Sequence, residues 1–267
     1  DLEDGLVCVV TDENRGGTFV YRSANVATNN GGTIFNGWTR QYDGAVNVKW
    51  FGARSLAGFD NADIINNAIL SINGQNTIMF PAGIYESTKS INIAISGTSL
   101  VGAKENGFVY GPSSGKVGIK FTSVLTYGIS SNTTAGDDAT QVAYTTIKNM
   151  TIDGNGLVGY CIDGLYFVTM EDCSVTGATI AGAHGTISQG SHFHRVGFNG
   201  NNIGFRLKGG GTQSFEKCTF RENTLQGLYL DVNIGNSFKD CVLESNGGQG
   251  LYIDGPSKQS TFYSCYW

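Results

Sequence analysis

Short runs of alternating apolar and polar residues fill the second half of the chain and recur at a fixed interval. The phrase "FEKCTF" begins at Phe215, and its counterpart "FKDCVL" begins at Phe238. With four similar segments, these phrases start at Ile147, Met170, Phe193, Phe215, Phe238 and Phe262. A second phrase keeps the same interval, as in "GLYLDV" and "GLYIDG", and Gly- and Asn-rich turns separate the two. The chain therefore contains an internal repeat of about 23 residues.

Each repeat predicts half-buried β-strands. Alternation with a period of two is typical of a strand with one buried face, and Gly and Asn mark the turns between strands. A unit this short leaves no room for a crossover helix, so strands of successive units are expected to lie parallel. Such a stack is a parallel β-helix, an all-β single-stranded solenoid with one coil per repeat. A leucine-rich repeat has a similar length, but its Leu-x-x-Leu-x-Leu spacing is absent here.

Stacking turns each position of the repeat into a ladder of side chains about 4.8 Å apart. The expected interior ladders are Ile147, Met170, Phe193, Phe215, Phe238 and Phe262; Met150, Cys173, Val196, Cys218, Cys241 and Cys265; and Ile152, Val175, Phe198, Phe220, Leu243 and Trp267. Cysteine shares its ladder with Met and Val, so it is interpreted as a small apolar filler with a free thiol. In-register side chains point in parallel, which disfavours a disulfide between Cys218 and Cys241.

The N-terminal part has a different organisation. Residues 1–47 predict a small β-rich leader, or neck, built of short strands between Gly and Asn turns. The segment "FDNADIINNAILSI" then predicts a helix over about 60–72, with Asp60 at its N-cap and an apolar stripe of isoleucine and alanine. This helix would cap the open end of the solenoid, where an exposed strand edge otherwise invites pairing with other chains.

The β-helix is thus expected to occupy residues 48–267, with regular coils from about 145 to 267 and less regular coils before them. Trp267 ends the chain in the middle of a coil, without a polar capping segment. Because solenoids need terminal caps, we expect the β-helix to be incomplete at its C-terminal end.

Composition narrows the classes of function. The 39 glycines disfavour a mostly helical protein. The net charge of −5 and the absence of a basic tract predict no nucleic-acid binding. No apolar run reaches the roughly 20 residues that span a bilayer, so no membrane insertion is expected. The cysteines lack zinc-site spacing, and His184, His192 and His194 are interpreted as solvated surface, so we expect neither a metal nor a cofactor.

Two segments resemble a known protein family. They read "VKWFGARSLAGFDNADIINNAI" and "IMFPAGIYEST", and "SLVGA" follows them. They closely resemble the start of bacteriophage tailspikes of the pectate-lyase-like superfamily, in which a Phe-Gly-Ala segment precedes a capping helix and a Phe-Pro-Ala-Gly-x-Tyr strand opens a right-handed parallel β-helix. The leader also looks like the neck of capsule-degrading tailspikes. One departure is "RSLAGFD", where the family usually has Gly-Asp-Gly.

The resemblance implies a right-handed β-helix and a homotrimer on the tail of a virion, in contact with other phage tail proteins and outside the host cell. Its ligand would be a bacterial surface polysaccharide, either capsule or O-antigen. The leading hypothesis is a depolymerase that cleaves glycosidic bonds as a glycoside hydrolase or a lyase. The alternative is a non-catalytic adhesin or structural tail protein on the same scaffold. The neck-like leader disfavours a third class, the bacterial extracellular polysaccharide lyases.

Outward positions of the coils supply the candidate chemistry. One outward ladder is interpreted as Cys161, His184, Arg206, Tyr229 and Tyr252, and the next as Asp163, Lys208, Asp231 and Asp254. Aromatic faces stack on sugar rings and charged groups bind hydroxyls, so the predicted substrate-binding residues are Tyr229, Tyr252, Arg206 and Lys208.

Paired carboxylates are the candidate catalytic groups. Asp231 and Asp254 would lie one coil apart, about 5 Å, close to the separation found in retaining glycosidases. Glu222 and Glu244 form a second acidic set near the turn after the cysteine-bearing strand. Like-charged neighbours raise each other's pKa, which a general acid requires. The same carboxylates also fit a purely solubilising role on the surface of a β-helix.

Overall fold

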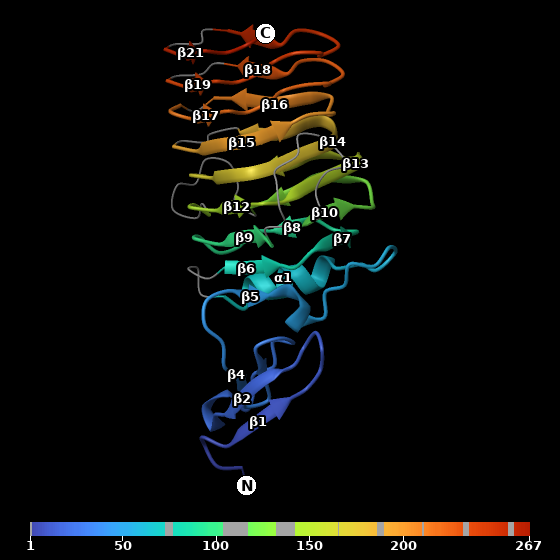
Figure 1. Ribbon diagram of the computed structural model, residues 1–267, viewed down its shortest axis with the longest axis vertical. Coiled ribbons are helices and arrows are strands. Elements are labelled where there is room, and N and C mark those ends of the chain that lie inside the picture. Colours follow the sequence, from blue (N-terminus) through green and yellow to red (C-terminus); the bar gives the residue numbers. More distant parts are fainter. Residues whose placement is uncertain are drawn as a thin grey trace.

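A computed structural model shows an elongated molecule with its two termini at opposite ends (Figure 1). The structure describes residues 2–72, 77–103, 117–131, 142–164, 166–185, 190–209, 211–231, 235–255 and 259–267.

A small antiparallel sheet forms the N-terminal end, with strand order β1-β2-β4-β3. Its strands are β1 (Val7–Val10), β2 (Gly17–Tyr21), β3 (Ile34–Phe35) and β4 (Trp38–Arg40), and a short 3₁₀ turn spans Ser23–Asn25. Arg40 is buried at the base of this sheet, where its guanidinium packs over the rings of Phe19 and Trp50. It donates hydrogen bonds to the backbone oxygens of Arg15 and Gly16, both at 2.6 Å. These hydrogen bonds offset the free-energy cost of burying the charged guanidinium.

Helix α1 (Ala62–Leu70) covers the lower end of the parallel stack (Figure 1). Its inward face is apolar, because Ile65, Ala68 and Ile69 are fully buried. Asp60 accepts a hydrogen bond from the backbone N–H of Ala62 and two more from Thr88, so it joins the start of the helix to the chain after β7. A 3₁₀ turn, η2 (Val48–Phe51), packs beside the helix, and β5 (Val46–Asn47) pairs with the first strand above it.

Parallel strands stack above this helix in successive coils (Figure 1). The lower coils contain β6 (Thr77–Phe80), β7 (Gly83–Ser87), β8 (Ile91–Asn92), β9 (Ser99–Gly102), β10 (Val117–Phe121) and β11 (Leu125–Ser130). The upper coils contain β12 (Thr146–Lys148), β13 (Thr151–Asp163), β14 (Thr169–Gly185), β15 (His192–Phe198), β16 (Ile203–Lys208), β17 (Ser214–Glu216), β18 (Leu228–Asp231), β19 (Ser237–Lys239), β20 (Leu251–Asp254) and β21 (Thr261–Tyr263). The predicted parallel β-helix is confirmed.

The phenylalanine ladder has the predicted register. Phe193, Phe215, Phe238 and Phe262 pair in order along β15, β17, β19 and β21. Their rings stack nearly parallel, with centroids 4.6 to 4.7 Å apart. One aromatic ring per coil therefore fills the interior continuously, with each ring covering the next.

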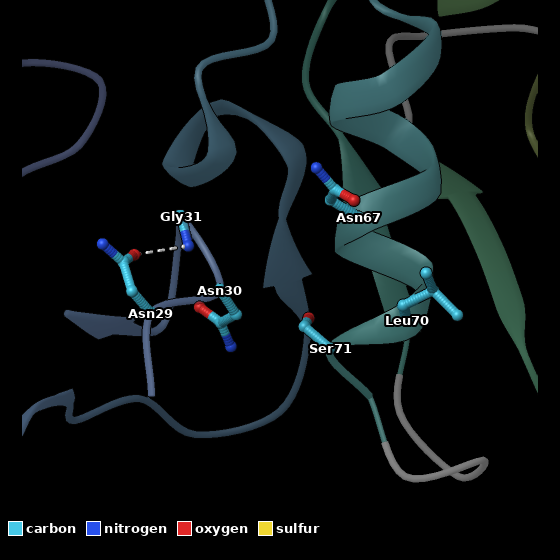
Figure 2. Close-up of a pocket in the computed structure, with 6 residues that line it drawn as sticks. All are labelled: Asn29, Asn30, Gly31, Asn67, Leu70 and Ser71. Carbon is cyan, nitrogen blue, oxygen red and sulfur yellow. Dashed lines mark hydrogen bonds between the residues drawn. The ribbon is translucent and has the colours of Figure 1, made fainter. Parts of the chain in front are cut away.

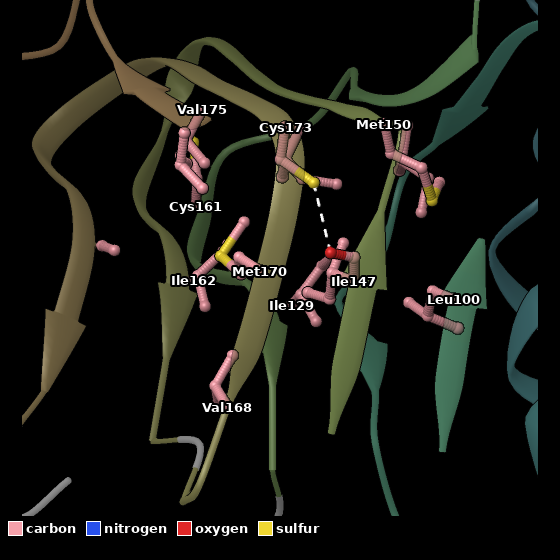
Figure 3. Packing of buried hydrophobic residues seen from close by; sticks show 14 of the residues in the cluster. Leu100, Ile129, Ile147, Met150, Cys161, Ile162, Val168, Met170, Cys173 and Val175 are labelled. Carbon is pink, nitrogen blue, oxygen red and sulfur yellow. Dashed lines mark hydrogen bonds between the residues drawn. The ribbon is translucent and has the colours of Figure 1, made fainter. Parts of the chain in front are cut away.

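The cysteine ladder is also interior, and all the cysteines are free thiols. The thiol of Cys173 donates to the carbonyl of Ile147 in the preceding coil at 3.3 Å, as Figure 3 shows. Cys218 repeats this contact with Phe193, and Cys241 with Phe215. Burial raises the pKa of Cys173 to about 12, so this thiol stays protonated and unreactive.

A sharp corner explains why two polar residues separate the aromatic residue from the cysteine in "FEKCTF". The residue before the cysteine position takes a left-handed conformation, with φ of 53° at Lys217 and 52° at Asp240. Asn149, Asp172, Arg195 and Ser264 do the same in their coils. The corner turns the chain between two strands, so both Phe215 and Cys218 point inward although they are three positions apart.

Buried and partly buried asparagines stabilise a second turn, between β15 and β16 and in the coils above it. The side chain of Asn223 donates to the carbonyl of Phe198 and accepts from the backbone N–H of Asn201, at 3.0 and 2.9 Å. Asn246 repeats the pattern one coil higher, with Phe220 and Asn223. Each amide therefore satisfies backbone groups of the coil below it.

Replacing Asn223 by alanine is expected to lower the free energy of unfolding by about 1–3 kcal/mol, because it leaves buried backbone groups without partners. Urea denaturation followed by circular dichroism measures this change. The control is Thr224→Ala, an exposed neighbour in the same turn. Equal stability of the two variants would contradict the role assigned to the asparagine ladder.

Candidate functional site

One side chain from each of five successive coils lines the outward face of β13, β14, β16, β18 and β20. The strand register places these residues on neighbouring rungs: Asp163, His184, Arg206, Tyr229 and Tyr252. Tyr160 stacks on His184 and Tyr127 stacks on Tyr160, and these seven residues together are called the outer strip.

The outer strip corrects the register predicted for Cys161. The sequence interval aligned Cys161 with His184, but Asp163 occupies that rung. Cys161 is fully buried, and its thiol donates to the carbonyl of Thr176 at 3.3 Å. The register shifts between β13 and β14 account for the error, because they break the regular interval at this point. For the same reason Asp163 does not belong to the ladder of Lys208, Asp231 and Asp254, so its predicted position was also wrong.

The predicted substrate-binding residues Arg206, Tyr229 and Tyr252 form one stack. The guanidinium carbon of Arg206 lies 5.0 Å from the centroid of the Tyr229 ring. The Tyr229 and Tyr252 rings follow, with centroids 5.1 Å apart and planes tilted by 39°. A cation over an aromatic face is attractive, so the stack holds Arg206 against the surface of the sheet.

Tyr229 is also bound to a predicted catalytic residue. Its hydroxyl donates to Oδ2 of Asp254 at 2.6 Å. This hydrogen bond to a carboxylate is the main reason that the pKa of Tyr229 rises to about 12. At neutral pH Tyr229 therefore remains a protonated donor.

The outer strip continues below Arg206 through residues that the sequence analysis did not select as site residues. Nδ1 of His184 lies 2.6 Å from Oδ1 of Asp163, and both side chains are mostly covered. The His184 ring stacks on Tyr160 at 4.7 Å, and Tyr160 stacks on Tyr127 at 5.9 Å. Tyr127 and Tyr160 belong to β11 and β13, where the repeat is irregular, so the repeat interval does not align them. Only the register of β11 with β13 shows that Tyr127 and Tyr160 are neighbours.

The outer strip is long and continuous. From Tyr127 to Tyr252 it crosses the sheet one strand at a time, which corresponds to about 24 Å at the usual strand spacing. It contains five rings, one guanidinium and one carboxylate. Such a surface offers aromatic and charged groups side by side.

The two predicted acidic pairs differ. Asp231 and Asp254 face each other in neighbouring strands, and Lys208 precedes Asp231 on the same ladder. Glu222 takes a left-handed corner conformation (φ 56°), and its equivalent one coil higher is Ser245 (φ 58°) rather than Glu244. Glu244 instead forms an ion pair with Arg221, with Nη2 of Arg221 2.7 Å from Oε1 of Glu244. The structure thus brings the aspartates onto adjacent rungs and does not stack the glutamates.

A charged ladder on β12, β14, β15, β17 and β19 is internally paired. Glu171 contacts Lys148 at 2.9 Å and Arg195 at 3.0 Å, and Glu216 contacts Lys239 at 3.3 Å. Exposed ion pairs of this kind contribute little stability individually. Their charges cancel within the ladder, so this face is a poorer candidate for a charged ligand than the outer strip.

A pocket of about 480 Å³ lies between the neck and α1 (Figure 2). It is lined by Asn29, Asn30, Gly31, Asn67, Leu70 and Ser71, and contains none of the candidate residues. The side chain of Asn29 accepts from the backbone N–H of Gly31 within its rim. Over the described ranges, no three His, Cys, Asp or Glu side chains are grouped as a metal site. Within the same ranges, no helix is long and apolar enough to cross a membrane.

Comparison with known proteins identifies the fold independently. A family model described as "Right handed beta helix region" matches residues 127–266. No curated protein sequence is recognisably similar to the chain.

Solved structures of phage proteins share this fold. Tailspike gp49 of Acinetobacter baumannii bacteriophage Fri1, described as a capsular polysaccharide depolymerase, matches with a TM-score of 0.70 and 12% identity over 99% of this chain and 60% of that one. The gp42 tailspike of Acinetobacter phage vb_AbaP_AS12 matches with a TM-score of 0.68 and 16% identity, and the match covers 99% of this chain and 51% of that one. ORF18 of Geobacillus virus E2 matches with a TM-score of 0.61 and 20% identity, and the match covers 99% of this chain and 63% of that one. The chain thus spans less than two thirds of these structures, and identities this low show the shared fold alone.

Proposed function

The chain belongs to the right-handed β-helix family, and from this membership we propose that it is a phage tailspike that binds and cleaves a bacterial surface polysaccharide. The polysaccharide is a capsule or an O-antigen, and the protein acts outside the host cell, on the virion tail. A homotrimer attached to other tail proteins is part of this proposal. It rests on the resemblance of residues 16–103 to tailspike sequences and on the likeness of fold to solved tailspikes.

The outer strip is the observation that carries the proposal. The stacked side chains of Tyr160, Tyr229 and Tyr252 present aromatic surface to a sugar chain that lies along the strip. The strip's length of about 24 Å suits an extended polymer lying along the solenoid axis better than a small molecule.

Arg206 and Lys208 bind sugar hydroxyls or acidic substituents in this proposal. Nε of Arg206 is buried and has no hydrogen-bond partner among the described residues. Arg206 also offers a planar fork that can bind two oxygens at once.

Cleavage is assigned to Asp231 and Asp254. Adjacent rungs place their strands about 5 Å apart, near the carboxylate separation used by retaining glycosidases. Asp254 accepts a hydrogen bond from the Tyr229 hydroxyl, an arrangement that suits an ionised base or nucleophile. Asp231 is then the acid. Glu222 and Glu244 are the weaker pair, because Arg221 already engages Glu244.

A non-catalytic adhesin is the second candidate. The hydrogen bond from Tyr229 occupies an oxygen of Asp254, so this aspartate also fits a purely structural role in a binding surface. The aromatic stack alone would account for polysaccharide binding without cleavage.

Incubation with purified capsule or O-antigen polysaccharide is expected to release new reducing ends or unsaturated sugars, measured by a reducing-sugar assay and by ultraviolet absorbance. Arg206→Gln should weaken polysaccharide binding by about tenfold, since hydrogen bonds to a charged group contribute about 1.5–3 kcal/mol. The matched control is Lys239→Gln, on the internally paired ladder. Binding without any new chain ends would contradict the depolymerase and support the adhesin.

A further inference from the structure

A second corner of the β-helix, just before β9, β12, β14, β15, β17, β19 and β21, uses a left-handed residue in each of these seven described coils. The residues are Gly97, Tyr144, Phe167, Gly190, Thr212, Gly235 and Gln259, with φ between 47° and 78°. Glycine adopts this conformation without steric cost, whereas a side chain is strained in it. Two consecutive coils nevertheless place bulky aromatic residues here, which is an outlier among residues of their size.

The two aromatic residues form an exposed stack. Tyr144 is 66% exposed and Phe167 is 37% exposed. Their ring centroids are 5.1 Å apart, and the planes differ by only 17°. Phe167 also lies against Gly190, where an added Cβ would come within 2.9 Å of the ring. The ring of Phe167 therefore packs against Gly190 of the coil above, and it stacks on the exposed ring of Tyr144.

Burial does not explain this pair, since an exposed ring gains little from the core. Strained residues concentrate at sites where a ligand is held. The pair lies close to the outer strip along the chain: Phe167 follows Asp163 by four residues, which span at most about 13 Å. A ligand lying along the strip can reach it.

We propose that Tyr144 and Phe167 form a second sugar-stacking subsite, which binds a further pyranose ring of the polysaccharide that lies along the outer strip. This inference rests on the proposed function. The glycan is favoured as the occupant because the subsite adjoins the strip and presents a flat, supported ring with a hydroxyl at its edge.

The test uses an array of purified bacterial capsular and O-antigen polysaccharides, followed by calorimetric titration with the strongest binder. Tyr144→Gly is expected to weaken that affinity by about tenfold, the loss typical of an aromatic binding residue. Its melting temperature should stay within about 3 °C of the parent value, because relief of the left-handed strain offsets the lost ring contact.

Thr212→Gly is the matched control. It also replaces a left-handed residue of this corner by glycine (φ 60° at Thr212), but the residue it removes has no ring. It should therefore leave the affinity unchanged. Tyr229→Ala, in the outer strip, reports on the proposed function separately.

The outcomes separate the two ideas. If the parent protein binds a polysaccharide and Tyr144→Gly binds it equally well, the subsite is wrong and the proposed function stands. If no polysaccharide binds the parent protein, the proposed function fails and the subsite fails with it. A fall in melting temperature above about 5 °C would mark Tyr144 as a structural residue and overturn the subsite. A change of oligomeric mass with unchanged affinity would assign the rings to a contact between copies of the chain, and would also overturn it.

Discussion

Replacing Phe215 by alanine is expected to lower the free energy of unfolding by about 3–5 kcal/mol, the range for removing a buried aromatic side chain. Phe215 has no exposed surface. Its ring lies between those of Phe193 and Phe238, at 4.6 and 4.7 Å, and meets the edge of Phe205 at 5.2 Å. Deleting it opens a gap in the middle of the phenylalanine ladder, where the coils above and below cannot close without breaking their register.

Guanidinium denaturation monitored by circular dichroism and by intrinsic fluorescence measures this loss. Both probes are needed, because solenoids can unfold in segments and then no single free energy describes the transition. Tyr263→Ala is the control: Tyr263 is 68% exposed and belongs to the next coil but one. A change below about 1 kcal/mol at Phe215 would show that the ladder is not the main source of cohesion between coils.

Asp254→Asn is expected to lower kcat by about 10²–10⁴-fold with little change in polysaccharide affinity, the effect typical of losing an acid–base group. Asparagine keeps the size of the side chain and can still accept from Tyr229, so the stack and the binding surface should persist. Asp231→Asn should have an effect of similar size, because the two carboxylates act as a pair. The measurement is the initial rate of reducing-end release from the polysaccharide that the protein binds.

Two controls make this experiment specific. Asp240→Asn makes the same substitution at a corner residue with φ 52°, a conformation that asparagine tolerates well, and should leave the rate unchanged. Glu244→Gln removes the partner of Arg221. A large loss of rate in Glu244→Gln with full activity in Asp254→Asn would move the catalytic site to the turn between β19 and β20.

The interior ladders were predictable because they depend on a local rule repeated many times. Each coil presents three apolar residues at the same positions, and stacking superimposes them. The same rule failed at Cys161, where the pairing of β13 with β14 changes register. It also failed for Glu222 and Glu244, since an interval of 22 rather than 23 residues places them at neighbouring but different positions of the coil.

The repeat interval, the apolar positions and the glycine-rich turns were sufficient by themselves to determine a parallel β-helix and its packed interior. These features follow from alternation and spacing along one chain. Only the tertiary structure decided which outward residues meet: the stack from Tyr127 to Tyr252, the bond between Tyr229 and Asp254, and the Tyr144–Phe167 pair. Contacts on the outer face depend on register shifts and on left-handed corners. A corner can be occupied by Gly, Tyr or Thr alike, so residue type does not reveal it, whereas the interior accepts only side chains that fill it.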